Sequence, residues 1–354
     1  MKNNINHFFS RIKHFAGVIL ICGITGSVLF ISCEGEPEDP LDVDVSGVEV
    51  EMTYFHFAEQ LAATDSANVK NLHVQLLNEY PGFYEEYTRS IVRLGNFKDP
   101  MMPANLAFFL KDPITQGGLD QINKVHTDLS GLESELELAF KHLKHYYADA
   151  TIPTIIFSYN SFNFGAYPTD EELILGLEMY LGYENEMVQD IPTNAIPDFM
   201  KRKMDPDYIL IDAMRSWFEF HYLPENESEE ILAKMIYHGK LLYAMDALMP
   251  DLSDHRKMRY SKAEWSWAEK NECNIWKELV DREYLRSKDD LLATKLLRDG
   301  PYTPGFPQES PSRLGQWIGW QIVAAYMREN PDLELPDLIK ETNIEKILKA
   351  YNPC

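Results

Sequence analysis

Cysteine is scarce in this chain of 354 residues, which contains only four. Cys22 and Cys33 lie near the N-terminus, so Cys273 and Cys354 are the only cysteines of the remaining chain. Two cysteines are too few for a disulfide framework. An oxidising compartment would allow a bridge between Cys273 and Cys354, but the sequence favours two unpaired thiols.

Positive charge is also sparse. The chain has 33 Lys and Arg residues against 56 Asp and Glu residues, which gives a formal net charge of −23. Binding to nucleic acid requires clustered Lys and Arg, so this composition excludes a nucleic-acid partner. The same excess of acid argues against a protein that lies flat on anionic lipid.

The first 32 residues have the pattern of a secretory signal peptide. Three basic residues precede an apolar run, 15–31, that contains no charged side chain. A basic segment followed by an apolar segment is typical of such signals. Because the run is near the lower limit for spanning a bilayer, an uncleaved membrane anchor is the alternative.

The tetrapeptide that ends at Cys33 favours a lipoprotein over an anchor. Phe30-Ile31-Ser32-Cys33 resembles a bacterial lipobox, in which the signal is cut before the cysteine and the cysteine then carries fatty acids such as palmitate. Acyl chains hold a protein on a membrane by hydrophobic burial. We therefore predict lipidation of Cys33 and a place in the cell envelope, on the periplasmic side or at the outer-membrane surface.

Composition divides the rest of the chain into a tether and a body. Residues 33–52 are acidic, contain Pro and Gly, and predict a flexible tether. An acidic run after a lipidated cysteine resembles surface-export signals of Bacteroidetes lipoproteins, although a solvated spacer is the simpler interpretation. Residues 53–354 show neither an internal repeat nor a linker, and predict a single, mostly helical globular domain that is helical from Thr53 onward.

Two consecutive helices, 206–222 and 229–249, are the clearest prediction within the body. Asp205 is a good N-cap and is followed by Pro206, which suits the first helical position. Ser228 is expected to cap the second helix in the same way.

Two strands are predicted before this helix pair, at 152–159 and 173–181. The first is an apolar, β-branched run, and the second alternates apolar residues with a period of two. Thr169 would also suit a helix cap, so a helix is the alternative for the second run. We predict an α+β fold, predominantly α-helical, with a small β-sheet packed beside the helix pair.

Further helices follow from caps and apolar periodicity. Capping boxes are expected at Ser130 with Glu133 and at Ser261 with Glu264. Later helices are expected from Ser310-Pro311 to Asn330 and over 336–350.

His142 and His145 lie three residues apart on the helix that follows Ser130. Nothing in the sequence completes a metal site around them. They stand beside Lys141 and Lys144, so we interpret both as solvated surface residues.

The helix pair carries residues that resemble the metal site of gluzincin-type peptidases. In those enzymes His-Glu-x-x-His places two zinc ligands on one helix face, and the Glu between them acts as general base. In this chain Glu219 keeps the position of the base, but Phe218 and Tyr222 replace both histidines. His238 precedes Gly239 on the second helix, where the resemblance places a Glu ligand.

The remaining polar groups make a poor metal site. Glu219 and His221 are two residues apart and so point about 200° apart on an ideal helix. His221 and His238 could meet across the helix pair, but two histidines alone bind weakly. We predict a non-catalytic, degenerate zincin-like body without a cofactor, in which Glu219 pairs with Arg215. The alternative is a periplasmic zinc metallopeptidase with Glu219 as base and with His221 and His238 as ligands.

Several runs, taken by order and spacing, together point to one known family. They are Ala139–His142 with Tyr146–Tyr147, Ile174–Gly182, Gly239–Tyr243, and Glu309–Val323 with Ala325–Met327. From about Phe55 to its end, the chain resembles the gliding-motility lipoprotein family GldB of Bacteroidetes. The resemblance implies a cell-envelope lipoprotein required for gliding, whose partners are proteins of the motility and type IX secretion machinery. It implies no established catalytic activity.

Overall fold

The computed structural model of the protein describes residues 40–65 and 67–354. The predicted signal peptide and Cys33 lie outside the described residues, as does the first part of the predicted tether. From Pro40 onward the chain belongs to one compact unit. Val45 is already buried there, and Lys144 Nζ donates a hydrogen bond of 3.0 Å to the carbonyl oxygen of Glu49.

A four-stranded mixed sheet lies in the first half of this unit. Its strands are β1 (Thr53–Phe55), β2 (Thr154–Ser158), β3 (Ala166–Pro168) and β4 (Glu172–Gly176), in the spatial order β1-β2-β4-β3. β1, β2 and β4 run parallel, whereas β3 is antiparallel to β4. The two predicted strands are thus present and pair with each other. The helix expected from Thr53 is wrong over β1, whose three residues are too few to show a period.

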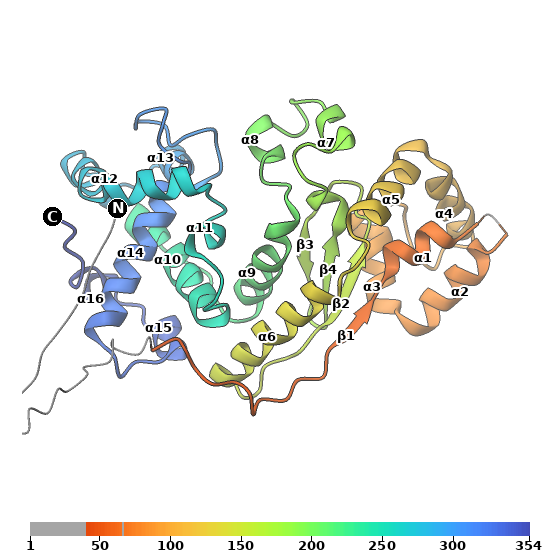
Figure 1. Ribbon diagram of the computed structural model, residues 1–354, viewed down its shortest axis with the longest axis horizontal. Coiled ribbons are helices and arrows are strands. Elements are labelled where there is room, and N and C mark those ends of the chain that lie inside the picture. Colours follow the sequence, from red (N-terminus) through yellow and green to blue (C-terminus); the bar gives the residue numbers. More distant parts are fainter. Residues whose placement is uncertain (1–39, 66) are drawn as a thin grey trace, which may run out of the picture. The chain divides into compact units, whose positions relative to one another are not determined.

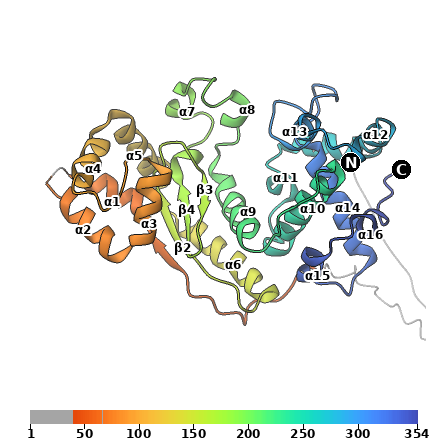
Figure 2. The same ribbon diagram turned by 180° about the vertical axis from the view of Figure 1, so that it is seen from behind.

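The two central strands are apolar because both of their faces are covered. Ile155, Ile156 and Phe157 of β2 are buried, and so are the residues Leu173–Leu175 of β4. α1 packs against β2, whereas α9 packs against β3 and β4. In Figures 1 and 2 the sheet lies between the helices α1–α5 and helix α9. Strands buried on both faces read as continuous apolar runs, as observed here.

β4 is shorter than predicted. The strand ends at Gly176, and a 3₁₀ turn, η2 (Leu177–Tyr180), follows. The alternation fails because Glu178 turns inward and is fully buried. Its Oε1 accepts hydrogen bonds from the backbone N–H groups of Asn160 (2.8 Å) and Phe162 (2.9 Å). Burial raises the pKa of Glu178 to about 7.

Helices make up most of the rest. Those before β2 are α1 (Phe57–Ala63), α2 (Val69–Glu79), α3 (Pro81–Glu86), the π-helical turn η1 (Tyr87–Ile91), α4 (Met102–Lys111), α5 (Pro113–Val125) and α6 (Ser130–Tyr146). Between the sheet and the next helix pair lie α7 (Glu186–Asp190), α8 (Asp198–Lys201) and η3 (Pro206–Tyr208). The remaining helices are α9 (Ile209–His221), α10 (Ile231–Leu248), α11 (Asp254–Lys257), α12 (Lys262–Asp281), η4 (Tyr284–Arg286), α13 (Asp290–Leu297), α14 (Leu314–Glu329), α15 (Leu335–Lys340) and α16 (Ile344–Leu348).

Two predicted helix caps form and two do not. Asp205 caps η3, which leads directly into α9, and Ser261 forms its capping box with Glu264. The box at Ser130 is wrong because α6 begins at Ser130 itself, whose N–H is bound by the side chain of Asp128 at 2.9 Å. The cap at Ser228 is wrong because α10 begins three residues later, with Glu230 as its N-cap.

The two C-terminal helix predictions need new boundaries. The helix expected from Ser310 begins at Leu314, although it ends at Asn330 as predicted. The helix expected over 336–350 is divided into α15 and α16. A buried lysine explains the break: Lys240 Nζ donates to the carbonyl oxygens of Ile339 (3.2 Å) and Glu341, where α15 ends.

α10 and α14 are in direct backbone contact. A Cβ atom on Gly239 would lie 2.1 Å from the carbonyl oxygen of Gly319, and one on Gly319 would lie 1.9 Å from that of Met235. These distances are far below van der Waals contact, so only glycine fits at the crossing. Figure 1 shows the two helices crossing side by side.

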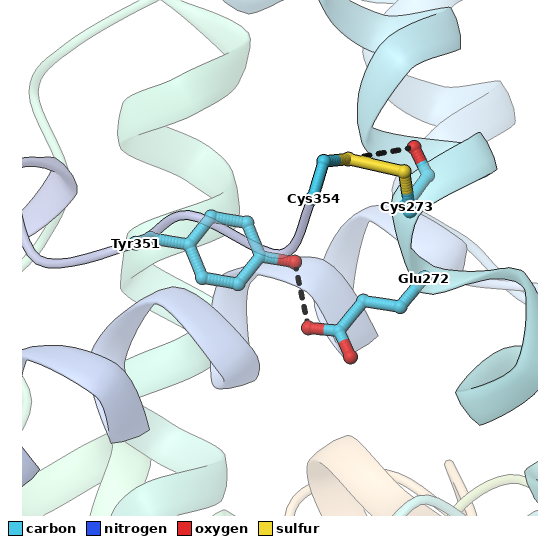
Figure 3. Close-up of a disulfide and its surroundings, with 4 residues drawn as sticks. All are labelled: Glu272, Cys273, Tyr351 and Cys354. Atoms are coloured by element: carbon cyan, nitrogen blue, oxygen red, sulfur yellow. Dashed lines mark hydrogen bonds between the residues drawn. A yellow bond between two sulfur atoms is a disulfide. The ribbon is translucent and has the colours of Figure 1, made fainter.

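A disulfide joins Cys273 of α12 to Cys354, and the expectation of two free thiols is therefore wrong (Figure 3). The Cα atoms are 5.2 Å apart, within the range for a bridge. Beside the bond, Tyr351 donates a hydrogen bond of 2.9 Å to Glu272. Sequence spacing did not reveal this pairing because 81 residues separate the two cysteines.

The interpretation of His142 is also wrong, because its side chain is buried. Burial lowers the pKa of His142, with a smaller contribution from His145, which is exposed as expected. His142 lies beside Leu143 on the inner face of α6, so the flanking lysines gave a false indication of the side on which it lies.

Candidate functional site

Two adjoining cavities lie where α9 faces α10, α13 and the start of α14. Their volumes are about 280 Å³ and about 800 Å³. Four charged residues line both: Asp212, Arg215, Arg259 and Asp299. We call the two cavities together the charged cleft. A concave site with converging charged groups is where ligand binding is normally found.

The walls of the cleft come from distant parts of the sequence. The smaller cavity is lined from the sheet side by Gly165, Ala166, Met179 and Tyr180. The larger is lined by α10 through Lys234 and His238, and by α13 and α14. α9 lies between them, so Asp212 and Arg215, one turn apart, face the cleft together.

Ion pairs hold three of the cationic side chains at the cleft. Arg259 lies 2.9 Å from Asp212. Asp299 pairs with Lys203 and, at 3.0 Å, with Nε of Arg313. Burial alone would raise the pKa of Asp299, but Arg313 and Lys203 outweigh it and hold that pKa well below its usual value. Asp299 is therefore ionised and joins the two cations.

Two of these arginines adopt left-handed backbone conformations. φ is +51° at Arg259 and +61° at Arg313. Each also donates to a backbone carbonyl oxygen across the cleft wall, Arg259 to Lys203 and Arg313 to Met258. Such conformations cost on the order of 1 kcal/mol or more for a residue with a Cβ, and they concentrate at functional sites. The surrounding contacts hold both residues in place.

Arg215 is bound differently from its neighbours. It donates a hydrogen bond of 3.0 Å to Oε1 of Gln316, a neutral group. The predicted pair with Glu219 does not form, because Glu219 instead accepts a hydrogen bond of 3.1 Å from Tyr237. Burial and the nearby Arg313 lower the pKa of Arg215.

The sequence-predicted site residues are divided by the structure. Glu219 lines the smaller cavity and His238 the larger. His221 lines neither: its Nε2 lies 3.0 Å from the carbonyl oxygen of Thr169, and its ring packs on Trp217. The histidines on the two helices therefore do not converge on Glu219.

His238 is a neutral imidazole. Burial, together with Arg215 and Arg313, lowers its pKa to about 3. Within the described part of the chain, its buried Nδ1 has no hydrogen-bond partner.

These residues do not fit a zinc site. Zinc in proteins takes three or four His, Cys or carboxylate ligands around one point. His221, His238 and Glu219 are engaged in three different directions, toward Thr169, the larger cavity and Tyr237. Across residues 40–65 and 67–354, no group of three such side chains could hold a metal ion.

Sequence comparison assigns the chain to a family. The sequence profile described as "Gliding motility protein GldB" matches residues 38–353. The chain belongs to the GldB family. Members are lipoproteins, so the family implies a lipid anchor in a membrane. Neither the curated proteins nor the solved structures contain a significant match.

Membership of the GldB family confirms the resemblance found in the sequence, whereas nothing in the comparisons supports a gluzincin scaffold. The match covers the body up to residue 353, including every residue of the charged cleft. None of the described helices is both long and apolar enough to cross a membrane.

Sequence reasoning missed most of the cleft. Lys203, Asp212 and Arg259 were not singled out, and Arg313 and Gln316 were noted only as part of the run Glu309–Val323. A usable indication was present, because Asp299 and Arg313 flank a Pro- and Gly-containing loop. Charged residues in such loops, held by rigid helices, often belong to binding sites.

Proposed function

We propose that this GldB-family chain is a non-catalytic protein of the gliding apparatus, anchored in the cell envelope by lipid on Cys33. In this proposal its helical body contacts proteins of the motility and type IX secretion machinery. The observation that carries the proposal is the family match over residues 38–353. The lipobox-like Phe30–Cys33 supplies the position of the anchor.

The geometry around Glu219 supports a role without catalysis. A general base must reach its proton donor, and in a zinc peptidase it must also lie beside the metal-bound water. Here Glu219 is bound to Tyr237, and His221 is turned toward Thr169. In this proposal Glu219 and His221 serve the packing of α9 against its neighbours.

The anchor is tested by labelling with a fatty-acid precursor in a gliding strain that lacks its own family member. The wild-type chain should incorporate label and restore gliding, and Cys33→Ser should lose both. Cys22→Ser is the matched control, since it removes the other cysteine of the N-terminal segment. Incorporation of label into Cys33→Ser would show that the lipidated residue lies elsewhere.

The absence of catalysis is tested with Glu219→Gln, which keeps an oxygen acceptor for Tyr237. Gliding should be unaffected. Loss of gliding by a variant present at wild-type levels, with stoichiometric zinc in the purified wild-type protein, would establish the peptidase alternative.

A further inference from the structure

The charges at the charged cleft do not cancel. Apart from the Lys234–Asp290 ion pair and the exposed Arg298, the cations that line it are Lys203, Arg215, Arg259 and Arg313. The carboxylates that face them are Asp212, Glu219 and Asp299. Three carboxylates stand against four cations, in a chain whose net charge is −23. A local excess of positive charge is therefore unusual for this molecule.

Arg215 is the cation of this set that forms no ion pair with a described residue. Glu219 acts on it only from a distance, since Glu219 accepts the hydrogen bond of Tyr237. Asp212 is engaged by Arg259, and Asp299 is engaged by Lys203 and Arg313. Over residues 40–65 and 67–354, the amide oxygen of Gln316 is the one hydrogen-bond partner of Arg215. A guanidinium presents five N–H donors, so most of the donors of Arg215 are left for other acceptors.

Other polar atoms beside Arg215 are also unused. In the described part of the chain, the buried Nδ1 of His238 and the buried Nε of Arg259 have no hydrogen-bond partner. Both residues line the larger cavity, as Arg215 does. A buried polar atom without a partner costs free energy, and a ligand in the larger cavity would supply the missing bonds.

We propose that the charged cleft binds a polar ligand through one oxyanion, a carboxylate or a phosphate group, held by Arg215. The fork of a guanidinium matches both groups, because each offers two oxygens side by side. The anion supplies the single negative charge that balances the cations, and the neutral His238 donates or accepts beside it.

The larger cavity limits the size of the ligand. Its volume of about 800 Å³ is that of a small-molecule site. The exposed Arg298 lies on its wall, with Lys234 and Asp290 paired nearby at 2.9 Å. Exposed positive charge on the wall of a cleft attracts an anion in the field of an otherwise acidic protein.

Two anions of simple structure test the proposal and separate the two ligand chemistries. The full-length lipidated protein in non-ionic detergent is titrated with inorganic phosphate and, separately, with succinate, at constant ionic strength. Saturable heat by calorimetry, with a rise in the thermal unfolding midpoint, is expected for at least one of them. The anion that binds identifies the ligand chemistry.

Arg215→Gln distinguishes a binding role from a structural one. It removes the charge, and affinity should fall at least about tenfold. The midpoint without anion should rise, because an unbalanced buried charge is removed. Arg328→Gln, on the exposed end of α14, makes the same change outside the cleft and should bind as the wild type does.

Gln316→Glu is the second variant, since it places a carboxylate on the hydrogen-bond partner of Arg215. It should abolish anion binding. It also loses the hydrogen bond of 2.6 Å that Nε2 of Gln316 donates to the carbonyl oxygen of Leu297, so circular dichroism checks that the variant is folded. The proposal is overturned if neither anion binds the wild-type protein, or if Arg215→Gln and Gln316→Glu bind as tightly as Arg328→Gln does.

Discussion

Two lysine–aspartate pairs on α10 have nearly the same length and different surroundings. Asp246 lies 2.8 Å from Lys257, and their side chains are 14% and 3% exposed. Lys234 lies 2.9 Å from Asp290, with exposures of 25% and 90%. Asp246 also accepts a hydrogen bond of 2.7 Å from the indole of Trp320.

We call Asp246–Lys257 the inner pair and Lys234–Asp290 the outer pair. The inner pair is enclosed by other elements, whereas the outer pair lines the larger cavity of the charged cleft. Asp246 ties α10 to α11 and α14, and each of its oxygens has a partner. In the charged cleft beside Lys234, N–H groups of Arg215 and the Nδ1 atom of His238 have no hydrogen-bond partner among the described residues. Balanced charge therefore marks the part of this protein that holds the fold, and unbalanced charge marks the part that is available to a ligand.

Breaking the inner pair should have the largest effect. Asp246→Ala removes the closer and more buried acceptor of the Lys257 ammonium and the acceptor of the Trp320 N–H, which should lower the free energy of unfolding by about 3–5 kcal/mol. Chemical denaturation measures it. Asp254→Ala removes the exposed second partner of Lys257, at 3.3 Å, and should change little. Equal losses in the two variants would contradict the comparison.

The second prediction concerns Glu178, a buried carboxylate that forms no ion pair with a described residue. Its pKa is raised from 4.5 to about 7, so the folded protein binds a proton that the unfolded chain releases. Stability from this group is present below pH 4.5 and is lost as the pH rises through 7. Glu178→Gln should therefore gain stability relative to wild type with rising pH, on the order of 2–3 kcal/mol at pH 8.

Denaturation of both proteins at pH 5 and pH 8 checks this prediction. The side-chain acceptor Oε1 is retained in Glu178→Gln, so the hydrogen bonds from the backbone N–H groups of Asn160 and Phe162 should survive. A difference between variant and wild type that is the same at both pH values would contradict it.

Opening the helix contact should have a smaller effect than breaking the inner pair. Gly319→Ala forces a methyl group onto the carbonyl oxygen of Met235 and should destabilise by about 1–3 kcal/mol as the helices shift. Gly131→Ala in α6 meets no atom within 4 Å and should be neutral or stabilising. Thermal unfolding compares them, and a stabilised Gly319→Ala would show that α10 and α14 separate without cost.

The smallest effect is expected at the outer pair. Asp290→Ala removes an exposed partner of Lys234, and surface ion pairs contribute little. The unfolding midpoint should not move measurably, at low or at high salt. A loss of stability as large as that of Asp246→Ala would show that the Lys234–Asp290 pair contributes as much to the stability of the fold as the inner pair does.

Local patterns predicted the elements of this fold better than their ends. The apolar run 152–159 and the capping box at Ser261 correspond to real elements, since each depends on neighbouring residues. β4 ended early because Glu178 finds its partners 16 and 18 residues away. Helix α15 ended where Lys240, about 100 residues earlier in the chain, reaches its carbonyl oxygens.

The site was harder to predict than the fold. The sequence drew attention to Glu219 and His238, and both line the cleft. It also paired Glu219 with Arg215 by their helical spacing, whereas Tyr237 and Gln316 are the actual partners. Asp299 meets Lys203 across 96 residues, and such meetings depend on tertiary packing that spacing does not encode.

The disulfide has a mechanical consequence. Cys273 and Cys354 close a covalent loop that contains α13 and α14, two of the helices along the larger cavity. Unravelled, 81 residues would extend to roughly 280 Å. With the disulfide formed, a force that pulls Cys354 away from the chain before Cys273 is carried by the S–S bond. The residues between the two cysteines are then not extended. The bond therefore protects α13 and α14, at the wall of the cleft, from extension along this path.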